Sequence, residues 1–390
     1  MQDLKTYDIS MERGFLCSFE ADEVKLTGPL QTAREIAIQL PQFLPSSQIR
    51  HILESKLPLF DAVTVVADCT DAQARLTMVH YSFMVQTYVW GEPTPPKVLP
   101  ACLVQPIVAL ADRLGQQPLL PYSGYVLDNW ACLDKNNPID LDKIYMLQNF
   151  LGGQDEIWFV LIHVAIEAKA GGVLARIKPL IEAIDEKDAK HVMQLLQEIS
   201  AIWVDINAIF DRLPERCDPY IYFERVRPYI HGWQDNPALP NGIIYEGVER
   251  YEKAGQAFRG QTGSQNSIVP TMDALMGVGH AADPLKSFLD QLHIYRPPAH
   301  RQFIDDVRKE STLRSFVEQS GDKGLIEAYN ANIEAVAKFR SKHLEYAASY
   351  INKQGKTTAG NDNDVGTGGT PFMRYLKKHR DETAANLLPA

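Results

Sequence analysis

The chain has 390 residues, enough for a large buried core and for division into two domains. Hydrophobic residues make up 45% and charged residues 23%, ordinary values for a globular protein. The formal net charge is −10 without a sustained basic run, so nucleic acid and a membrane surface are not expected partners.

The first part of the chain, residues 1 to 145, predicts a small and mostly helical domain that includes a connector. Asp71 can cap an amphipathic helix that ends near Trp90-Gly91, and a proline-rich connector follows at 92–100. Residues 101–114 return to a helical pattern. Strand signals are sparse throughout, and the best candidate strand is 62–66.

The second part, residues 146 to 390, predicts a large all-α domain. Residues 157–170 are apolar on nearly every side, so this helix should be central, and Gly171-Gly172 should interrupt it. Asp185 is expected to start a long amphipathic helix that Pro214 stops. Residues 331–351 read as one further long helix. The predicted fold class is therefore mainly α.

The chain shows no sign of export or of a disulfide framework. Residues 1–14 lack the apolar core of a signal peptide, and no apolar run reaches the length needed to cross a bilayer. Five scattered cysteines without a CxxC pair indicate reduced thiols rather than disulfides or a zinc–cysteine site. We expect a cytoplasmic protein with a small-molecule substrate.

Two residues in 331–351 depart from a simple apolar stripe. Arg340 and His343 share one helix face with Ile333, Val336 and Ala347. One interpretation is a partly buried histidine hydrogen-bonded to a neighbour, with the arginine reaching to water. The other is a histidine presented to a metal or haem, with the arginine placed to neutralise the carboxylates of the cofactor.

Three other features also allow both a structural and a functional interpretation. His163 lies in the most apolar helix, either as a core residue or as an acceptor for a substrate N–H. Arg227 follows two aromatic residues and is either a surface arginine or a clamp for a substrate carboxylate. The segment FRGQTGSQNS at 258–267 is either a flexible turn or a loop that closes on a ligand.

Eight segments, taken together and in order, resemble the indoleamine 2,3-dioxygenase family. They are LPYSGYVLDNW (120–130), YFERVRPYIHGW (222–233), IIYEGV (243–248), FRGQTGSQNS (258–267), IYRPPAHRQFI (294–304), SGDKGLIEAYN (320–330), RSKHLEYAASYI (340–351) and GTGGTPFM (366–373). The PPAHR block, the GTGGT block and His343 between them are together specific for this family. The resemblance implies an all-α haem enzyme that binds haem b.

The resemblance also implies roles for individual residues. His343 corresponds to the proximal ligand of the haem iron, and Arg340 to an arginine near the haem that pairs with Asp273. Arg227 corresponds to the carboxylate-binding arginine. The remaining positions fall into a substrate group, Tyr222, Phe223, Tyr122, Phe159, Ile230, Thr262 and Thr367, and a loop over the haem that includes Gly260 and Ser264.

His163 is the informative departure from the family pattern. Mammalian members carry a small hydroxyl residue there, whereas the related tryptophan 2,3-dioxygenases place a histidine that hydrogen-bonds the indole nitrogen. The resemblance therefore implies a bacterial-type member with a more restrictive pocket, in which His163 orients the substrate.

The expected activity is cleavage of the indole C2–C3 bond of L-tryptophan, or of a related indole, by O₂ to give N-formylkynurenine. Two alternatives stay open. One keeps the haem but performs monooxygenation or rearrangement of a tryptophan derivative, and the other is a haem-based gas sensor. The oligomeric state is not predicted.

Overall fold

The computed structural model describes residues 1–389 except 252, 283, 355–360 and 363. The fold is mainly α, as the sequence predicts. The helices are α1 (Gly28–Ala37), α2 (Leu40–Phe43), α3 (Ile49–Lys56), α4 (Ala62–Ala67), α5 (Asp71–Trp90), α6 (Ala101–Leu114), α7 (Gln154–Asp185), α8 (Ala189–Asp211), α9 (Pro219–Ile221), α10 (Ile268–Met276), α11 (Pro284–His293), α12 (Pro298–Glu310), α13 (Leu313–Ser320), α14 (Lys323–Ala347) and α15 (Phe372–Ala384). The strands are β1 (Val98–Leu99), β2 (Trp130–Cys132), β3 (Ile144–Met146), β4 (Ile243–Tyr245) and β5 (Gly255–Gln256).

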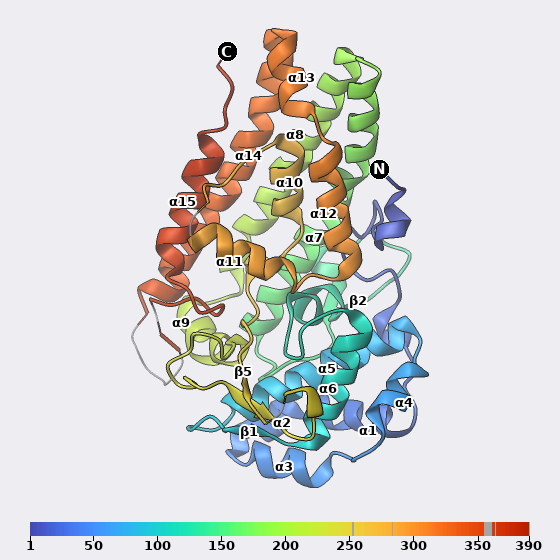
Figure 1. Cartoon of the computed structure of the whole chain (residues 1–390), viewed down its shortest axis with the longest axis vertical. Coiled ribbons are helices and arrows are strands. Elements are labelled where there is room, and N and C mark those ends of the chain that lie inside the picture. The colour runs from blue at the N-terminus through green and yellow to red at the C-terminus, as the bar shows by residue number, and fades with distance from the viewer. Residues whose placement is uncertain (252, 283, 355–360, 363, 390) are drawn as a thin grey trace.

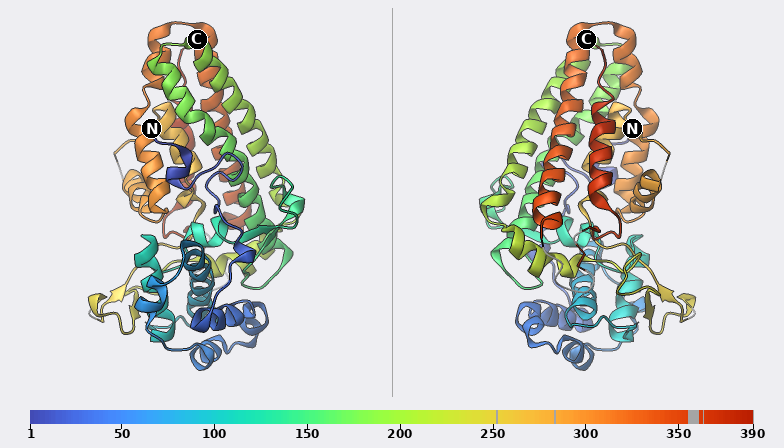
Figure 2. Two further views of the ribbon diagram at one scale, coloured as in Figure 1. Left: turned by 90° about the vertical axis from the view of Figure 1, so that its right-hand side faces the viewer. Right: turned by 90° about the vertical axis from the view of Figure 1, so that its left-hand side faces the viewer.

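The molecule is elongated, and its longest helices lie at one end. Figure 1 shows α7, α8 and α14 rising together through the upper part, with α1 to α6 gathered below. Helix α7 packs on α8, α8 on α14, and α14 on α15, and the side views in Figure 2 show the same layers. Side chains from several of the upper helices therefore lie close enough to line the same cavity.

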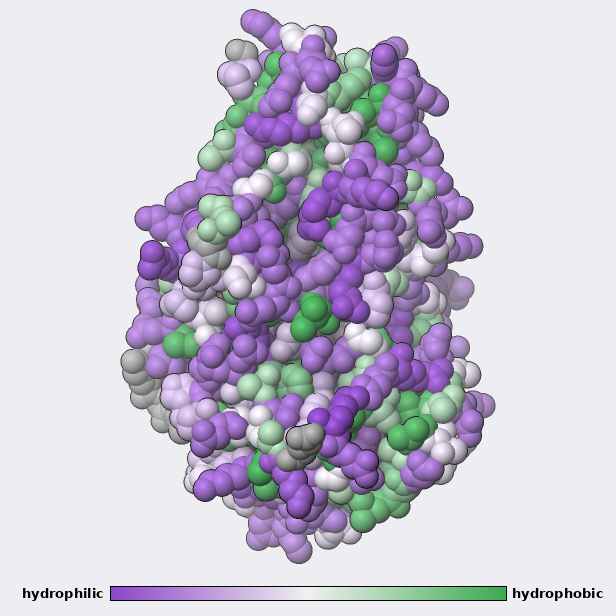
Figure 3. Space-filling model, in the orientation of Figure 1, coloured by the Kyte–Doolittle hydropathy of each residue, from purple (hydrophilic) through white to green (hydrophobic). Residues whose placement is uncertain are grey.

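Helix α7 forms the centre of the upper part because apolar, buried residues make up most of its length. By length and composition α7 could cross a membrane, which corrects the expectation that no apolar run is long enough. However, 72% of its most apolar window is buried within the protein, as in a core helix. The face in Figure 3 is mostly hydrophilic, with small separate apolar patches.

Glycine at 171 does not break α7, contrary to the prediction. A Cβ atom there would lie 2.3 Å from the carbonyl oxygen of Met11 and 2.8 Å from the backbone nitrogen of Gly14. The absent side chain thus lets the N-terminal segment cross directly over the helix. Asp185 ends α7 instead of starting the next helix. Asp188 caps α8 by accepting a hydrogen bond from the His191 N–H (3.0 Å).

The predicted strand at 62–66 is wrong, because these residues form helix α4. Asp61 caps this helix by accepting a hydrogen bond from the Thr64 backbone (3.2 Å). Val66 is buried while Val63 is 74% exposed, so the valines form one buried and one exposed helix face. A good cap and amphipathic packing on α6 outweigh the β propensity of valine.

Three π-helical turns lie next to residues predicted for the site. They are η4 (Ser123–Leu127), η7 (Tyr222–Val226) and η11 (Ala348–Asn352). The first follows Tyr122, the second leads into Arg227, and the third continues α14 beyond its end at Ala347. The predicted single helix over 331–351 is therefore α14 followed by a π turn. Such turns widen the helix locally and often occur at functional sites.

Contacts cross the predicted domain boundary at residue 145. Strand β1 pairs in parallel with β4, with Val98 opposite Ile244. The N-terminal amine forms an ion pair with Glu310. One continuous hydrophobic core runs from Tyr7 to Leu388. The division into domains at 1–145 and 146–390 stays a prediction.

Candidate functional site

A cavity of about 650 Å³ lies among α7, α8, α10, α14 and α15. Its volume falls within the roughly 300–1,000 Å³ of typical ligand and cofactor sites. A neighbouring pocket of about 130 Å³ shares part of the wall, including His163 and His343. The two cavities thus form adjoining compartments around the two histidines that the sequence singled out.

His343 projects from α14 into both cavities. Burial, with smaller contributions from His163 and Arg340, lowers the pKa of His343 to about 4. Its imidazole is therefore neutral at pH 7, the form that binds a metal. The ring makes no hydrogen bond to any residue that the structure describes. This leaves the nitrogen lone pair available, as an axial ligand of haem iron requires.

Arg340 is held in the cavity wall rather than reaching to water. Its guanidinium donates to Asp273 Oδ2 (2.6 Å) and to the His379 carbonyl oxygen (3.1 Å), and it also bonds Thr383. The Arg340 side chain is only 11% exposed. The pairing of Arg340 with Asp273, implied by the resemblance, is present. A fixed cation in this wall suits a cofactor that carries carboxylates.

His163 has a defined tautomer. Its Nδ1 lies 2.7 Å from the carbonyl oxygen of Phe159, one turn earlier in α7. Because a carbonyl oxygen only accepts, Nδ1 carries the proton and the neutral ring keeps Nε2 as an acceptor. Burial lowers the pKa of His163 below its usual value of 6.5, which favours this neutral form. His163 can therefore accept a hydrogen bond within the cavity.

Aromatic rings surround His163. The Phe159 ring centroid lies 4.7 Å from the imidazole and 4.7 Å from the ring of Tyr222. Both aromatic residues line the smaller pocket together with Ile230. The rings form an apolar slot beside one hydrogen-bond acceptor, an arrangement that suits a planar heteroaromatic ligand.

Tyr122 lines the large cavity and is paired with a carboxyl group. Its hydroxyl donates to Glu167 Oε1 (2.8 Å), whereas Glu167 Oε2 is buried without a hydrogen-bond partner. Burial raises the pKa of Glu167 to about 8, so Glu167 is a neutral carboxylic acid at pH 7. Glu167 therefore adds a buried carboxyl group to the wall of the larger cavity.

Arg227 is a buried cation that lies behind the smaller pocket. Its side chain is fully buried and its centre lies 5.4 Å from the ring centroid of Phe223. The guanidinium donates to Asn361 and to the Val365 carbonyl oxygen (2.5 Å), and Nε has no partner. Burial lowers the pKa of Arg227 to about 10, so it is still charged at pH 7. It forms no ion pair with a described residue, which is unusual for a buried charge.

Three segments cross where Gly260 lies. A Cβ atom on Gly260 would come within 2.2 Å of the Gly232 nitrogen and 2.5 Å of the Thr367 carbonyl oxygen. The Thr367 hydroxyl donates to the Gln261 carbonyl oxygen (2.6 Å), joining the GTGGT segment to the 258–267 loop. Thr262 accepts from the Ser264 N–H (3.4 Å). This loop is therefore an ordered wall rather than a free turn.

The structure brings most of the predicted residues together. Those lining one or both cavities are His163, Tyr122, Phe159, Tyr222, Ile230, Thr262, Thr367, Ser264, Asp273, Arg340 and His343. Arg227, Phe223 and Gly260 lie outside the lining.

Four polar residues near the cavity escaped the sequence analysis: Glu167, Gln265, His280 and His379. Glu167 is four residues after His163 and so shares its helix face, which could have indicated it. His379 and Glu382, three residues apart, carried a similar signal.

Comparison with known proteins places this chain in a described family. A profile of the family described as "Indoleamine 2,3-dioxygenase" matches residues 3–386. The human protein "Indoleamine 2,3-dioxygenase 2" is 30% identical over 398 residues, covering 99% of this chain and 95% of that protein. The Saccharomyces cerevisiae "Indoleamine 2,3-dioxygenase" is 28% identical, with 98% and 93% covered. A "6-hydroxytryptophan 2,3-dioxygenase" of Fusarium equiseti is also 28% identical, with 99% and 98% covered.

Proposed function

The chain belongs to the indoleamine 2,3-dioxygenase family, and from that premise we propose that it is a haem-dependent dioxygenase of L-tryptophan or a related indole. The net reaction adds both atoms of O₂ across the indole C2–C3 bond, which breaks to give N-formylkynurenine. The observation that carries the proposal is the pair of neutral histidines, His163 and His343, on the walls of the same two cavities.

The larger cavity suits a haem in three respects. His343 offers a neutral imidazole without a protein partner. Apolar residues such as Ile166, Phe210 and Leu289 cover much of the wall. Arg340 and Ser264 provide polar groups for the propionates. Bound there through His343, the haem iron would supply O₂ binding and the oxygen chemistry, while the protein orients the substrate.

His163 orients the indole in this proposal. Its Nε2 accepts a hydrogen bond from the indole N–H, while Phe159 and Tyr222 pack against the ring. A fixed acceptor beside an apolar slot selects one orientation of a flat ring. The role is positioning and requires no proton transfer to His163.

Arg227 binds the substrate carboxylate in this proposal. Its present acceptors, Asn361 and the Val365 carbonyl, are neutral and belong to the segment that leads into GTGGT. A carboxylate that replaced them would give the buried guanidinium a charged partner. Substrate binding would then displace Asn361 and the Val365 carbonyl from Arg227 and bring residues 366–370 closer over the smaller pocket, excluding water.

The experiment that tests this function uses haem-loaded, reduced protein mixed with L-tryptophan in air. The expected result is N-formylkynurenine, identified by its absorbance and mass, with haem-loaded protein lacking the substrate as the blank. The absence of product with intact, O₂-binding haem would favour the sensor alternative instead. A cytoplasmic location and reduced thiols fit this chemistry, and all five cysteines are free in the structure.

A further inference from the structure

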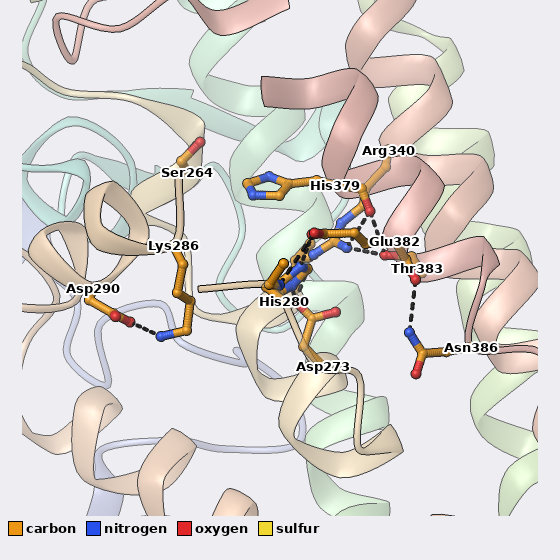
Figure 4. A network of polar contacts seen from close by, with 12 residues as sticks. Ser264, Asp273, His280, Lys286, Asp290, Arg340, His379, Glu382, Thr383 and Asn386 are labelled. Atoms are coloured by element: carbon orange, nitrogen blue, oxygen red, sulfur yellow. Dashed lines mark hydrogen bonds and ion pairs between the residues drawn. The ribbon is translucent and has the colours of Figure 1, made fainter. Parts of the chain in front are cut away.

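A second group of potential metal ligands lies at the edge of the large cavity, apart from His343. Nitrogen atoms of His280 and His379 and a carboxylate oxygen of Glu382 all lie within 4.8 Å of one another. Figure 4 shows His280 between Asp273 and Glu382, with the His379 ring beside them. Both histidines line the cavity wall.

The local structure explains why the three side chains converge. His379 and Glu382 are three residues apart on α15, so both project from the same helix face. His280 comes from the segment after α10, which ends at Met276 with a left-handed Gly277. Its Nδ1 lies 2.6 Å from Glu382 Oε2, and its ring centroid is 5.1 Å from that of His379. The ligand atoms thus come from one helix, α15, and from the short connection after α10.

His280 also has the supporting contact that metal-binding histidines usually have. Its Nε2 lies 3.3 Å from Asp273 Oδ2, and Asp273 is in turn held by Arg340 at 2.6 Å. A carboxylate on the far nitrogen fixes the ring orientation. Nδ1 donates its proton to Glu382 in this structure and would release that proton on binding a metal. Asp273 is not itself one of the three proposed ligands.

His379 has an unused nitrogen. Its Nε2 is buried and has no hydrogen-bond partner. A buried nitrogen with a free lone pair is costly unless something binds it. A metal ion would satisfy it.

We propose that His280, His379 and Glu382 bind a divalent transition-metal ion, with Zn²⁺ the best-suited probe. Two imidazoles and one carboxylate are a typical ligand set for such ions, and they leave at least one position for water. Tetrahedral ligation with bonds of ~2.0–2.1 Å places ligand atoms roughly 3.4 Å apart, so small side-chain rotations close the site. The carboxylates of Glu382 and Asp273 offset the ion's charge against the nearby cations Arg340 and Lys378.

The test measures zinc in the haem-loaded full-length protein. The protein is treated with a chelator and dialysed against buffered micromolar Zn²⁺, and zinc and iron per chain are counted by mass spectrometry. We expect one zinc per chain in the wild type. His379→Ala and Glu382→Gln should each weaken zinc binding by at least about tenfold, since each removes one of three protein ligands.

The matched control is His191→Ala, which removes an exposed histidine on α8. It should keep full zinc binding. Unchanged haem absorbance and circular dichroism in all variants separate loss of the site from loss of the fold. X-ray absorption at the zinc edge should show nitrogen and oxygen neighbours only.

The proposal is overturned if haem-loaded wild type binds no zinc, if both variants bind it as well as the wild type, or if sulfur ligates the ion. None of these outcomes depends on tryptophan turnover. The metal site and the proposed reaction can therefore fail separately.

Discussion

At the residue scale, the chemistry depends on which atoms are already occupied by protein partners. His163 donates a hydrogen bond from Nδ1 to a backbone carbonyl oxygen, which leaves Nε2 as a free acceptor. Neither ring nitrogen of His343 forms a hydrogen bond with a described residue. Arg227 is charged and buried yet bonded to neutral acceptors. From these contacts we propose that His163 is a hydrogen-bond acceptor, His343 a metal ligand and Arg227 an anion-binding residue.

The acceptor role of His163 predicts a substrate-dependent effect. His163→Ala should lower kcat/KM for L-tryptophan by roughly tenfold, the value of about 1.4 kcal/mol for one buried hydrogen bond. It should have little effect on 1-methyl-L-tryptophan, which lacks the indole N–H. Steady-state kinetics of both enzymes with both substrates measure this coupling. Equal losses for the two substrates would contradict the hydrogen bond.

The anion role of Arg227 predicts a different pattern. Arg227→Lys keeps the charge but loses the paired donors, so KM for L-tryptophan should rise by about 10- to 100-fold, reflecting ~1.5–3 kcal/mol for a charged hydrogen bond. Tryptamine, which lacks the carboxylate, is the matched control substrate and should bind the variant and wild type alike. If KM for L-tryptophan is unchanged in the variant, the proposed contact between Arg227 and the substrate carboxylate is wrong.

At the element scale, close backbone crossings shape the site. Gly171 admits the N-terminal segment over α7, and Gly260 admits Gly232 and Thr367 beside the cavity. The π turns η7 and η11 adjust the helices that carry Tyr222 and lead away from His343. The position of the loop at 258–267 thus depends on backbone contacts with distant segments.

The crossing at Gly260 predicts a sharp contrast between two glycines of one loop. Gly260→Ala should destabilise the fold by roughly 1–3 kcal/mol and reduce haem retention, because the new methyl group meets backbone atoms that cannot move independently. Gly263→Ala is the matched control, since a Cβ atom there meets nothing within 4 Å. Thermal unfolding measures the stability of both variants, and haem content is compared between Gly260→Ala and wild type, because Gly263 itself lines both cavities. Similar behaviour of the two variants would disprove the packing argument.

The sequence could indicate the central helices but not these crossings. Periodicity identified the apolar core of α7 and the histidine face of α14, because burial on one helix leaves a local pattern. It wrongly predicted a helix break at Gly171, because the contact of this glycine with residues 11–14 is not visible in the local sequence. It also wrongly predicted a strand at 62–66, because the burial of a valine depends on distant segments. Asp273 with Arg340 and the alignment of the site residues came from the family resemblance. His280 was missed because Glu382 lies 102 residues away in sequence, and the i, i+3 spacing of His379 and Glu382 was overlooked.

At the scale of the whole molecule, the site is built into a core that continues through both predicted domains. Residues from α7, α8, α10, α14 and α15 meet at the larger cavity, and β1 with β4 ties the lower end to the second half of the chain. A change in pH that lowers the free energy of unfolding should therefore also lower the haem content of the protein.

Buried neutral histidines predict acid sensitivity. Burial lowers the pKa of His80 to about 4, below the value of 6.5 expected in the unfolded chain. Between pH 6.5 and 4 the unfolded state binds more protons, so the free energy of unfolding falls as the pH falls. Its Nδ1 contacts Gln148 Oε1 (3.0 Å), which an amide in His80→Gln can still reach.

From pH 7 to pH 5, denaturant unfolding should therefore show wild type losing about 2 kcal/mol more than His80→Gln. His191→Ala, at an exposed site, is the control and should follow the wild type. Parallel losses in the wild type and His80→Gln would show that His80 does not bind a proton on unfolding.

The number of oxygen atoms that pass from O₂ into the product tests the central claim most directly. Haem-loaded, reduced protein is mixed with L-tryptophan under ¹⁸O₂, and the product mass is measured at once, before the formyl oxygen exchanges with water. The proposed dioxygenation predicts N-formylkynurenine carrying two ¹⁸O atoms. A product with one labelled atom, or an isomer with none, would contradict it and favour monooxygenation or rearrangement.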